Sequence, residues 1–190
     1  ETRYDPRSPY SATKAASDHL VKAWFHTYGL PTLVSNCGNN YGPWQFPEKL
    51  IPTIINSAIS LKKIPIYGNG LNVRDWIYVE DHIEALLLIL LNGKIGESYC
   101  IGSNQEFTNI EIAHKICNHL DEIKPYDYSY KKLIKFVKDR PGHDERYAIN
   151  PKKITRNLGW KPNYSFNKAL KITISWYLSN INWCKSLSEK

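Results

Sequence analysis

A tyrosine and a lysine four positions apart, Tyr10 and Lys14, lie in the segment PYSATKAASDHLVKAW. Residues at this spacing share one face of a helix, so both side chains can reach the same target. A phenol with a pKa of about 10 is a poor base at neutral pH, but a neighbouring ammonium group favours the phenolate. Such a pair could take a proton from an alcohol hydroxyl while the adjacent carbon loses hydride to a nicotinamide cofactor. The alternative is an ordinary pair of exposed helix residues.

A helix has to present this pair, and the sequence predicts one from residue 9 to about residue 28. Ser8 suits the N-cap position, Pro9 suits the first helical position, and apolar residues then recur at helical spacing. Gly29 is expected to cap the C-terminal end, and Pro31 prevents the helix from continuing.

The residues after this helix predict a strand that ends beside a polar loop. A buried strand is expected over residues 32–37, and the turn-forming run GNNYGP follows at 38–43. In open α/β sheets, ligands bind at the carboxyl ends of the strands. We therefore expect the tyrosine-lysine pair and this loop to face one crevice.

The rest of the chain continues the alternation of helices and strands. Helices are expected over 51–61, over 82–91 with Asp81 as N-cap, from the capping box Thr108-Asn109-Ile110-Glu111 onward, and over 165–178 as the last helix; strands are expected over 64–67, 73–79 and 99–101. The turn Gly68-Asn69-Gly70 predicts that the first two of these strands form a hairpin. A domain boundary is expected near residues 124–145, rich in Lys, Tyr, Asp and Pro, and within it residues 131–138 are expected to be a loop or linker surface.

The composition is that of a folded globular protein, with 190 residues of which 42% are hydrophobic and 23% charged. The chain contains no methionine and opens on Glu1-Thr2-Arg3, so we expect a fragment of a longer protein. No apolar run reaches the roughly 18 residues that a membrane span needs, so we expect no membrane partner. The four cysteines lack paired spacing, which favours a reducing, cytoplasmic location.

The net charge of +7 raises the possibility of nucleic-acid binding. However, Lys and Arg are spread along the chain with acidic residues among them. We therefore expect no nucleic-acid partner, and the charge is equally compatible with a small anionic ligand such as a nucleotide.

Two other motifs could carry chemistry but have simpler interpretations. Gly68-Asn69-Gly70 lacks the third glycine and the following helix of a dinucleotide-binding loop. On a helix, His114 and Cys117 share a face while His119 points elsewhere, and Cys117 falls on the apolar stripe, so we expect core packing and no metal site.

Four segments together carry a resemblance to a known family: YDPRSPYSATKAASDHLVKAW, GNNYGPWQFPEKLIP, PIYGNGLNVRDWIYVEDH and DRPGHDERYAI. From residue 3 to about residue 178 the chain resembles the extended short-chain dehydrogenase/reductase family, and within it the dTDP-sugar 4,6-dehydratase branch. The tyrosine-lysine pair marks the superfamily, and RDWIYVEDH marks the branch that acts on nucleotide sugars. The stretches NNYGPWQFPEKLIP and DRPGHDERYAI are together more specific, because they are typical of the dehydratase branch.

The resemblance implies an α/β fold, namely the C-terminal part of a doubly wound (Rossmann-type) parallel sheet with a small mixed α/β substrate domain. Residues 1–190 would form one incomplete unit. Residues 1–45 and parts of 73–115 would supply the last strands and helices of the NAD-binding domain, and 46–72 and 116–190 would form most of the nucleotide-sugar domain. The implied cofactor is NAD, the implied ligand is a small-molecule nucleotide sugar, and the implied assembly is a homodimer, in agreement with the alanine-rich face of residues 12–23.

The resemblance also implies roles for individual residues. Tyr10 would be the catalytic base, and Lys14 would assist it and bond the nicotinamide ribose. Tyr10, Lys14 and Asn40 would all lie at the cofactor, and Asn39 would contact the substrate. The remaining implied substrate-binding residues are Lys49, Leu50, Ile51, Pro52, Pro65, Ile66, Tyr67, Arg74, Asn109, Asp139, Arg140, Pro141, Gly142 and His143. Among these, Arg74 and Arg140 would meet the diphosphate, because a guanidinium can bond two oxygens at once; a surface salt bridge is the alternative for each.

The chain departs from the family pattern in what it lacks. The glycine-rich loop for the NAD pyrophosphate, the catalytic threonine and the Asp-Glu pair that removes water across C5 and C6 of the sugar are all absent from it, so we expect no turnover by this chain alone. The full implied cycle is oxidation at C4, loss of water, and return of hydride at C6. Two alternatives remain: another nucleotide-sugar enzyme, such as a 4-epimerase or a decarboxylase, or a basic nucleotide- or nucleic-acid-binding module that carries the tyrosine-lysine spacing by chance.

Overall fold

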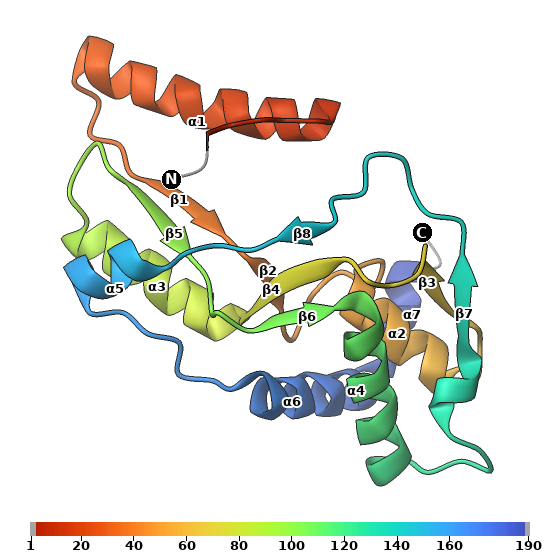
Figure 1. The fold of residues 1–190 in the computed structure, drawn as a ribbon. Coiled ribbons are helices and arrows are strands. Elements are labelled where there is room, and N and C mark those ends of the chain that lie inside the picture. The colour runs from red at the N-terminus through yellow and green to blue at the C-terminus, as the bar shows by residue number, and fades with distance from the viewer. Residues whose placement is uncertain (1–2, 189–190) are drawn as a thin grey trace.

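The computed structural model describes residues 3–188, an α/β arrangement in which helices flank short parallel strands (Figure 1). The helices are α1 (Pro9–Tyr28), α2 (Leu50–Ile59), α3 (Val79–Asn92), α4 (Asn109–Ile123), α5 (Lys152–Leu158), α6 (Phe166–Ser179) and α7 (Ile181–Ser188), with the 3-10 helix η1 (Tyr130–Leu133). The strands are β1 (Val34–Cys37), β2 (Asn39–Tyr41), β3 (Ile64–Tyr67), β4 (Val73–Tyr78), β5 (Ser98–Ile101), β6 (Glu106–Thr108), β7 (Ile134–Val137) and β8 (Arg146–Tyr147). Glu1 and Thr2 of the expected chain opening lie outside the described residues.

Most strand pairs are parallel. β1 pairs with β5, β3 pairs with β7, and the central strand β4 pairs with β2 and β8, all in parallel, whereas β6 runs antiparallel to β4. Parallel pairing requires long crossover connections, which the helices between the strands supply. Within residues 3–188 no helix is both long and apolar enough to span a bilayer.

The expected hairpin over residues 64–79 is wrong, because its two strands pair with different partners. β3 pairs with β7 and β4 with β2, and these partners are distant in the sequence. The turn between them does need its glycines, since Gly68 and Gly70 both have positive φ angles, of 57° and 74°. A Cβ atom on Gly68 would lie 2.7 Å from a carboxylate oxygen of Asp139, so this turn packs tightly against the segment that follows β7.

The boundaries of α1 are confirmed. The hydroxyl of Ser8 accepts a hydrogen bond from the backbone N–H of Ser11, and Gly29 ends the helix with a φ of 68°. Along its whole length α1 has no buried residue, and it lies apart from the other helices, above β1 and β5 in the view of Figure 1. The helix that carries Tyr10 and Lys14 therefore makes few packing contacts with the described part of the chain.

Three other local expectations have different outcomes. The capping box of α4 is confirmed, with Thr108 and Glu111 bonded reciprocally. Asp81 is not an N-cap: it lies in the first turn of α3, where its buried carboxylate accepts hydrogen bonds from the backbone N–H groups of Asn163 and Tyr164 at 2.7 and 3.3 Å. The expected polar loop at 38–43 is partly strand β2, whose backbone pairs with β4.

Two clusters of buried hydrophobic residues hold the elements together. The larger unites α2, β3, α4 and α6, and the smaller lies between α3, α5, β5 and the end of β4. Cys117 is fully buried in the larger cluster, as its place on the apolar stripe predicts. The same cluster includes Tyr130 of η1. The expected loop or linker surface at 131–138 is wrong, since these residues belong mostly to η1 and β7. α7, which follows the expected last helix, was not anticipated.

Candidate functional site

A pocket of about 360 Å³ gathers most of the residues that the sequence singles out. Asn39, Asn40, Gln45, Glu48, Lys49, Leu50, Thr53, Pro65, Tyr67, Arg74, Trp76, Asn109, Arg140 and His143 line it. These residues come from β2, the start of α2, β3, β4, the first turn of α4 and the segment after β7. Elements far apart in the sequence therefore converge on one hollow.

One part of the pocket wall is cationic. Arg74 is only 7% exposed, and its guanidinium donates hydrogen bonds to the backbone oxygens of Val73 and Asp144 at 2.7 and 2.8 Å. Burial lowers the pKa of Arg74, and the nearby Arg140 lowers it further, while Asp144 opposes both. None of the ion pairs found within residues 3–188 includes Arg74 or Arg140. A buried guanidinium that is held by backbone carbonyls and forms no ion pair favours an incoming anion.

The segment after β7 orders a histidine beside these arginines. Asp139 and His143 are 2.8 Å apart, between Oδ1 and Nδ1, and this bond is the main reason why the pKa of Asp139 is lowered. The arrangement fixes the imidazole of His143 in the pocket wall. Asp139 itself, with Pro141 and Gly142, does not line the pocket.

Another part of the wall consists of amides. Asn39 and Asn40 lie at the carboxyl-terminal side of the sheet in β2, in register with Trp76 and Ile77. Asn40 donates from Nδ2 to the Cys37 sulfur at 3.3 Å and to the Gly38 carbonyl at 3.4 Å, while its Oδ1 is buried without a hydrogen-bond partner.

Tyr10 and Lys14 do not line this pocket, although they face the same region of the sheet. The phenol of Tyr10 is 75% exposed on the first turn of α1. The positive charge of Lys14 lowers the pKa of the Cys37 thiol against the dominant effect of burial, which raises it. Likewise Tyr10 is among the groups that raise the pKa of Tyr147, after burial, and the Tyr147 hydroxyl donates to the Cys37 carbonyl at 3.3 Å. The pair therefore lies near the end of β1, next to the strand that carries the amides.

Three predicted binding residues have side chains that point elsewhere. Ile51 and Ile66 are fully buried in the larger hydrophobic cluster, and Pro52 is buried within α2. Only the backbone of these residues could meet a ligand. Their neighbours Leu50, Pro65 and Tyr67 do line the pocket.

Three lining residues escaped the sequence reasoning: Gln45, Glu48 and Trp76. Trp76 belongs to the larger hydrophobic cluster and is 3% exposed. Gln45 and Glu48 belong to the polar stretch between β2 and α2, and the signal that could have identified them is a run of polar side chains directly after a strand end.

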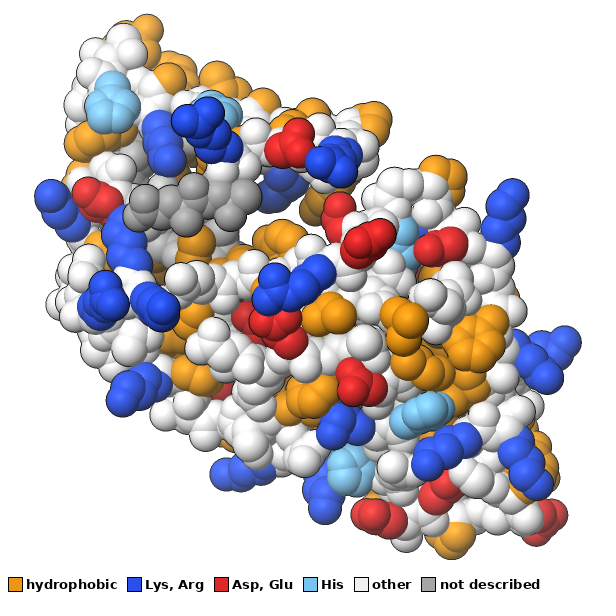
Figure 2. All heavy atoms as spheres, viewed as in Figure 1, with side chains coloured by type: hydrophobic (Ala, Val, Ile, Leu, Met, Phe, Trp, Pro, Cys, Tyr) orange, Lys and Arg blue, Asp and Glu red, His pale blue; other side chains and the backbone are white. Residues whose placement is uncertain are grey.

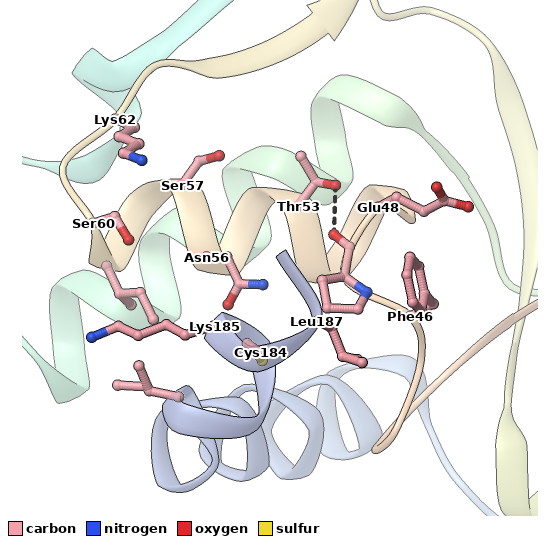
Figure 3. A pocket seen from close by; sticks show the side chains of 13 residues that line it. Phe46, Glu48, Thr53, Asn56, Ser57, Ser60, Lys62, Cys184, Lys185 and Leu187 are labelled. Carbon is pink, nitrogen blue, oxygen red and sulfur yellow. Dashed lines mark hydrogen bonds between the residues drawn. The ribbon is translucent and has the colours of Figure 1, made fainter. Parts of the chain in front are cut away.

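A second hollow, of about 480 Å³, lies between α2 and α7 (Figure 3). Hydroxyl and amide side chains of α2 face Cys184 and Lys185 of α7 across it. Glu48 and Thr53 line both hollows, and the Thr53 hydroxyl donates to the Pro47 carbonyl at 3.0 Å.

One face of the molecule shows basic side chains without a single basic patch. On the face drawn in Figure 2, Lys and Arg side chains are scattered, with acidic side chains between them. Among the described residues no cluster of three His, Cys, Asp or Glu side chains is placed to hold a metal ion.

Comparison with known proteins supplies a family. A family model described as GDP-mannose 4,6 dehydratase matches residues 1–173. A curated dTDP-glucose 4,6-dehydratase from Escherichia coli is 56% identical over 188 residues, which cover 99% of this chain and 52% of that protein. The chain thus spans about half the length of the curated relatives that it matches.

Solved structures of similar proteins agree with these sequence matches. The crystal structure of dTDP-glucose 4,6-dehydratase from Bacillus anthracis in complex with NAD superposes with a TM-score of 0.90 at 46% identity, covering 98% of this chain and 57% of that one. A dTDP-glucose 4,6-dehydratase from Streptomyces venezuelae, solved with NAD and a second ligand, gives a TM-score of 0.90 at 40% identity, covering 96% and 55%. The predicted Rossmann-type α/β fold class is therefore confirmed.

Proposed function

The chain belongs to the GDP-mannose 4,6 dehydratase family, and from that membership we propose that it forms part of an NAD-dependent dTDP-glucose 4,6-dehydratase. This enzyme would convert dTDP-glucose to dTDP-4-keto-6-deoxyglucose and water. The observation that carries the proposal is the pocket that the buried Arg74, the exposed Arg140 and the amides of β2 line together, with neither arginine in an ion pair within the described residues. A nucleotide sugar needs both, since its diphosphate is anionic and its hexose is neutral and polar.

The choice of dTDP over GDP comes from the relatives. The family description names GDP-mannose, whereas the matched proteins above half identity are dTDP-glucose enzymes. We propose that Arg74, Arg140 and His143 hold the diphosphate, and that Lys49, Leu50, Pro65, Tyr67 and Asn109 surround the nucleoside. The buried Ile51, Pro52 and Ile66 would pack beneath the residues that surround the nucleoside and hold them in position.

The residues present also suit the nicotinamide end of the cofactor. The side chains of Tyr10 and Lys14 are exposed on α1, and the unpartnered Oδ1 of Asn40 is an acceptor without a donor. NAD, when bound, supplies the ring that accepts hydride from C4 of the hexose and later returns it at C6. We propose Lys14 and Asn40 as its contacts in this chain.

In the proposed mechanism Tyr10 takes the proton of the hexose C4 hydroxyl. The ammonium of Lys14 lies one helical turn away on the same face of α1 and would hold the bound ligand beside the Tyr10 hydroxyl. Asn39 orients the sugar from the end of β2. Elimination of water needs a further acid and base, which we assign to no residue of this chain.

The arrangement of the whole protein is part of the same proposal. Residues 1–45 and parts of 73–115 would contribute to the cofactor-binding domain, and 46–72 and 116–190 to the nucleotide-sugar domain. A cytoplasmic homodimer is inferred, with α1 in the interface, because Leu20, Trp24 and Tyr28 leave apolar surface exposed along this helix. Light scattering on the complete enzyme would show a single-chain mass if this inference about assembly is wrong.

The experiment joins residues 1–190 to the part of the Bacillus anthracis enzyme that lies outside the similarity. The chimera should remove water from dTDP-glucose, detected by mass spectrometry, whereas the chain alone should give no product. Tyr10→Phe should lower turnover by about 10²- to 10⁴-fold, because general base catalysis is lost. Tyr28→Phe, a 70% exposed tyrosine at the other end of α1, is the matched control.

Three outcomes would contradict the proposal. They are a preference for GDP-mannose, an epimer as the product, or full activity of the Tyr10→Phe chimera.

A further inference from the structure

The amide wall of the pocket includes a residue to which neither the sequence motifs nor the family resemblance gives a role. We propose that Gln45 is a substrate-contacting residue whose side-chain oxygen accepts a hydrogen bond from a hydroxyl group of the bound hexose. This inference rests on the proposed function, since it concerns the sugar end of the same pocket.

The orientation of the Gln45 amide is fixed by its neighbour. Its Nε2 donates to the backbone carbonyl of Asn40 at 2.8 Å. A carbonyl can only accept, so a flipped amide would set two oxygens against each other. Oε1 is therefore the free end of the side chain, and it is buried with no hydrogen-bond partner within the described residues. A buried acceptor without a donor destabilises the protein, and a ligand in the pocket that Gln45 lines can supply that donor.

The neighbouring amide points to the same kind of ligand. Asn40 uses its Nδ2 for Cys37 and Gly38, which leaves its Oδ1 as a second buried acceptor without a partner. Gln45 and Asn40 both line the pocket that Arg74 and Arg140 also line. A diphosphate carries only acceptor oxygens at neutral pH and suits the arginines, whereas hexose hydroxyls are donors and suit the Oε1 of Gln45, as a donor group of the cofactor suits the Oδ1 of Asn40. The amide wall therefore matches ligands that donate hydrogen bonds, and Gln45 matches the sugar.

The backbone that carries Gln45 is held on its outer side by the C-terminal helices. The Tyr177 hydroxyl of α6 donates to the Gln45 carbonyl, and the ring of Trp44 packs 4.8 Å from Trp176 and 5.2 Å from Trp183. Trp44 has a φ of 64°, which is uncommon for a residue other than glycine. The surrounding aromatic rings compensate for this strain, so the segment is preorganised, as a specific contact requires.

The test compares two ligands, dTDP and dTDP-glucose, by calorimetric titration of the full 190-residue chain, which contains every residue that lines the pocket. Gln45→Met keeps the length of the side chain and removes both polar atoms. It should weaken binding of dTDP-glucose about tenfold, because a hexose hydroxyl loses its acceptor, and leave the affinity for dTDP within about twofold. Asn92→Ala, which removes an exposed amide at the end of α3, is the control and should alter neither affinity.

A second measurement needs no substitution and stays valid if Gln45→Met fails to fold. In the ¹⁵N-labelled wild-type chain, the side-chain amide signals of Gln45 should shift on addition of dTDP-glucose and stay in place with dTDP. Equal weakening of both ligands, no weakening of either, or an unmoved Gln45 signal would overturn the role of Gln45. Absence of binding of both ligands to the wild-type chain would instead overturn the proposed function.

Discussion

The hydroxyl of Tyr177 donates a hydrogen bond of 2.5 Å to the backbone carbonyl of Gln45, which joins α6 to the pocket wall across 132 positions of sequence. Tyr177 is fully buried, and burial raises the pKa of its phenol, so it remains a donor at all physiological pH values. The contact makes a helix outside the pocket responsible for the position of a residue inside it.

Tyr177→Phe should therefore affect both stability and ligand binding. The Gln45 carbonyl would lose its part-buried partner, and the free energy of unfolding should fall by about 1 to 2 kcal/mol. Affinity for dTDP-glucose should fall more than affinity for dTDP, measured by urea unfolding and calorimetry. Tyr164→Phe, which removes an exposed phenol bonded to Glu80, should change stability by less than about 1 kcal/mol and leave both affinities unaltered. Identical effects of the two variants would contradict this linkage.

Arg74→Ala should weaken dTDP binding by about tenfold to a hundredfold, since a hydrogen bond to a charged group contributes about 1.5 to 3 kcal/mol. The matched control is Arg146→Ala, because Arg146 lies on the adjacent strand β8 and is engaged by Glu106 at 2.8 Å outside the pocket. Calorimetric titration with dTDP measures both. A loss of affinity in the Arg146 variant as large as in the Arg74 variant would indicate a general effect of charge.

The position of Lys14 can be tested by measuring the reactivity of the Cys37 thiol. Because the ammonium of Lys14 lowers the pKa of Cys37, Lys14→Gln should raise that pKa further above its ordinary value and slow alkylation of Cys37 by iodoacetamide at mildly alkaline pH. Mass spectrometry distinguishes Cys37 from Cys100, whose pKa is affected by Lys153 instead and whose rate should stay constant. Lys22→Gln, on the same helix, is the control. An unchanged rate at Cys37 would place Lys14 away from the end of β1.

The capping box of α4 predicts a pH dependence of stability. Bonds from the backbone N–H and hydroxyl of Thr108 lower the pKa of Glu111 in the folded chain. Its stabilising contribution is thus present above the pKa of the unfolded chain, about 4.3, and is lost as the pH falls through the lower folded-state pKa. Urea unfolding should show that Glu111→Gln destabilises at pH 7 and that the difference from wild type shrinks on acidification. The exposed Glu145→Gln should show no such trend.

Features that depend on neighbouring residues could be predicted from the sequence. The N-cap Ser8, the C-cap Gly29 and the Thr108-Glu111 box are local hydrogen-bonding patterns, and each is confirmed. Ten of the predicted binding residues line one pocket, because the motifs that carry the resemblance stand at the ends of strands and at helix starts.

Pairings over long distances could not be predicted in this way. The sequence around Gly68-Asn69-Gly70 has the local chemistry of a hairpin, yet β3 pairs with β7, and nothing within the turn encodes that partner. Asp81 precedes a helical pattern as an N-cap would, but its carboxylate is taken by the N–H groups of Asn163 and Tyr164. Gln45 was missed because its significance depends on Asn40 and Tyr177, which only the fold brings to it.

Glu48 and Thr53 stand between two hollows, one lined by the arginines and amides and the other lying against α7. A substitution of either residue therefore changes the lining of both hollows. Attempts to change which nucleotide the protein accepts should therefore leave these two positions intact. Ligands designed for the hollow between α2 and α7 should instead bind to Asn56 and Lys185, which line that hollow.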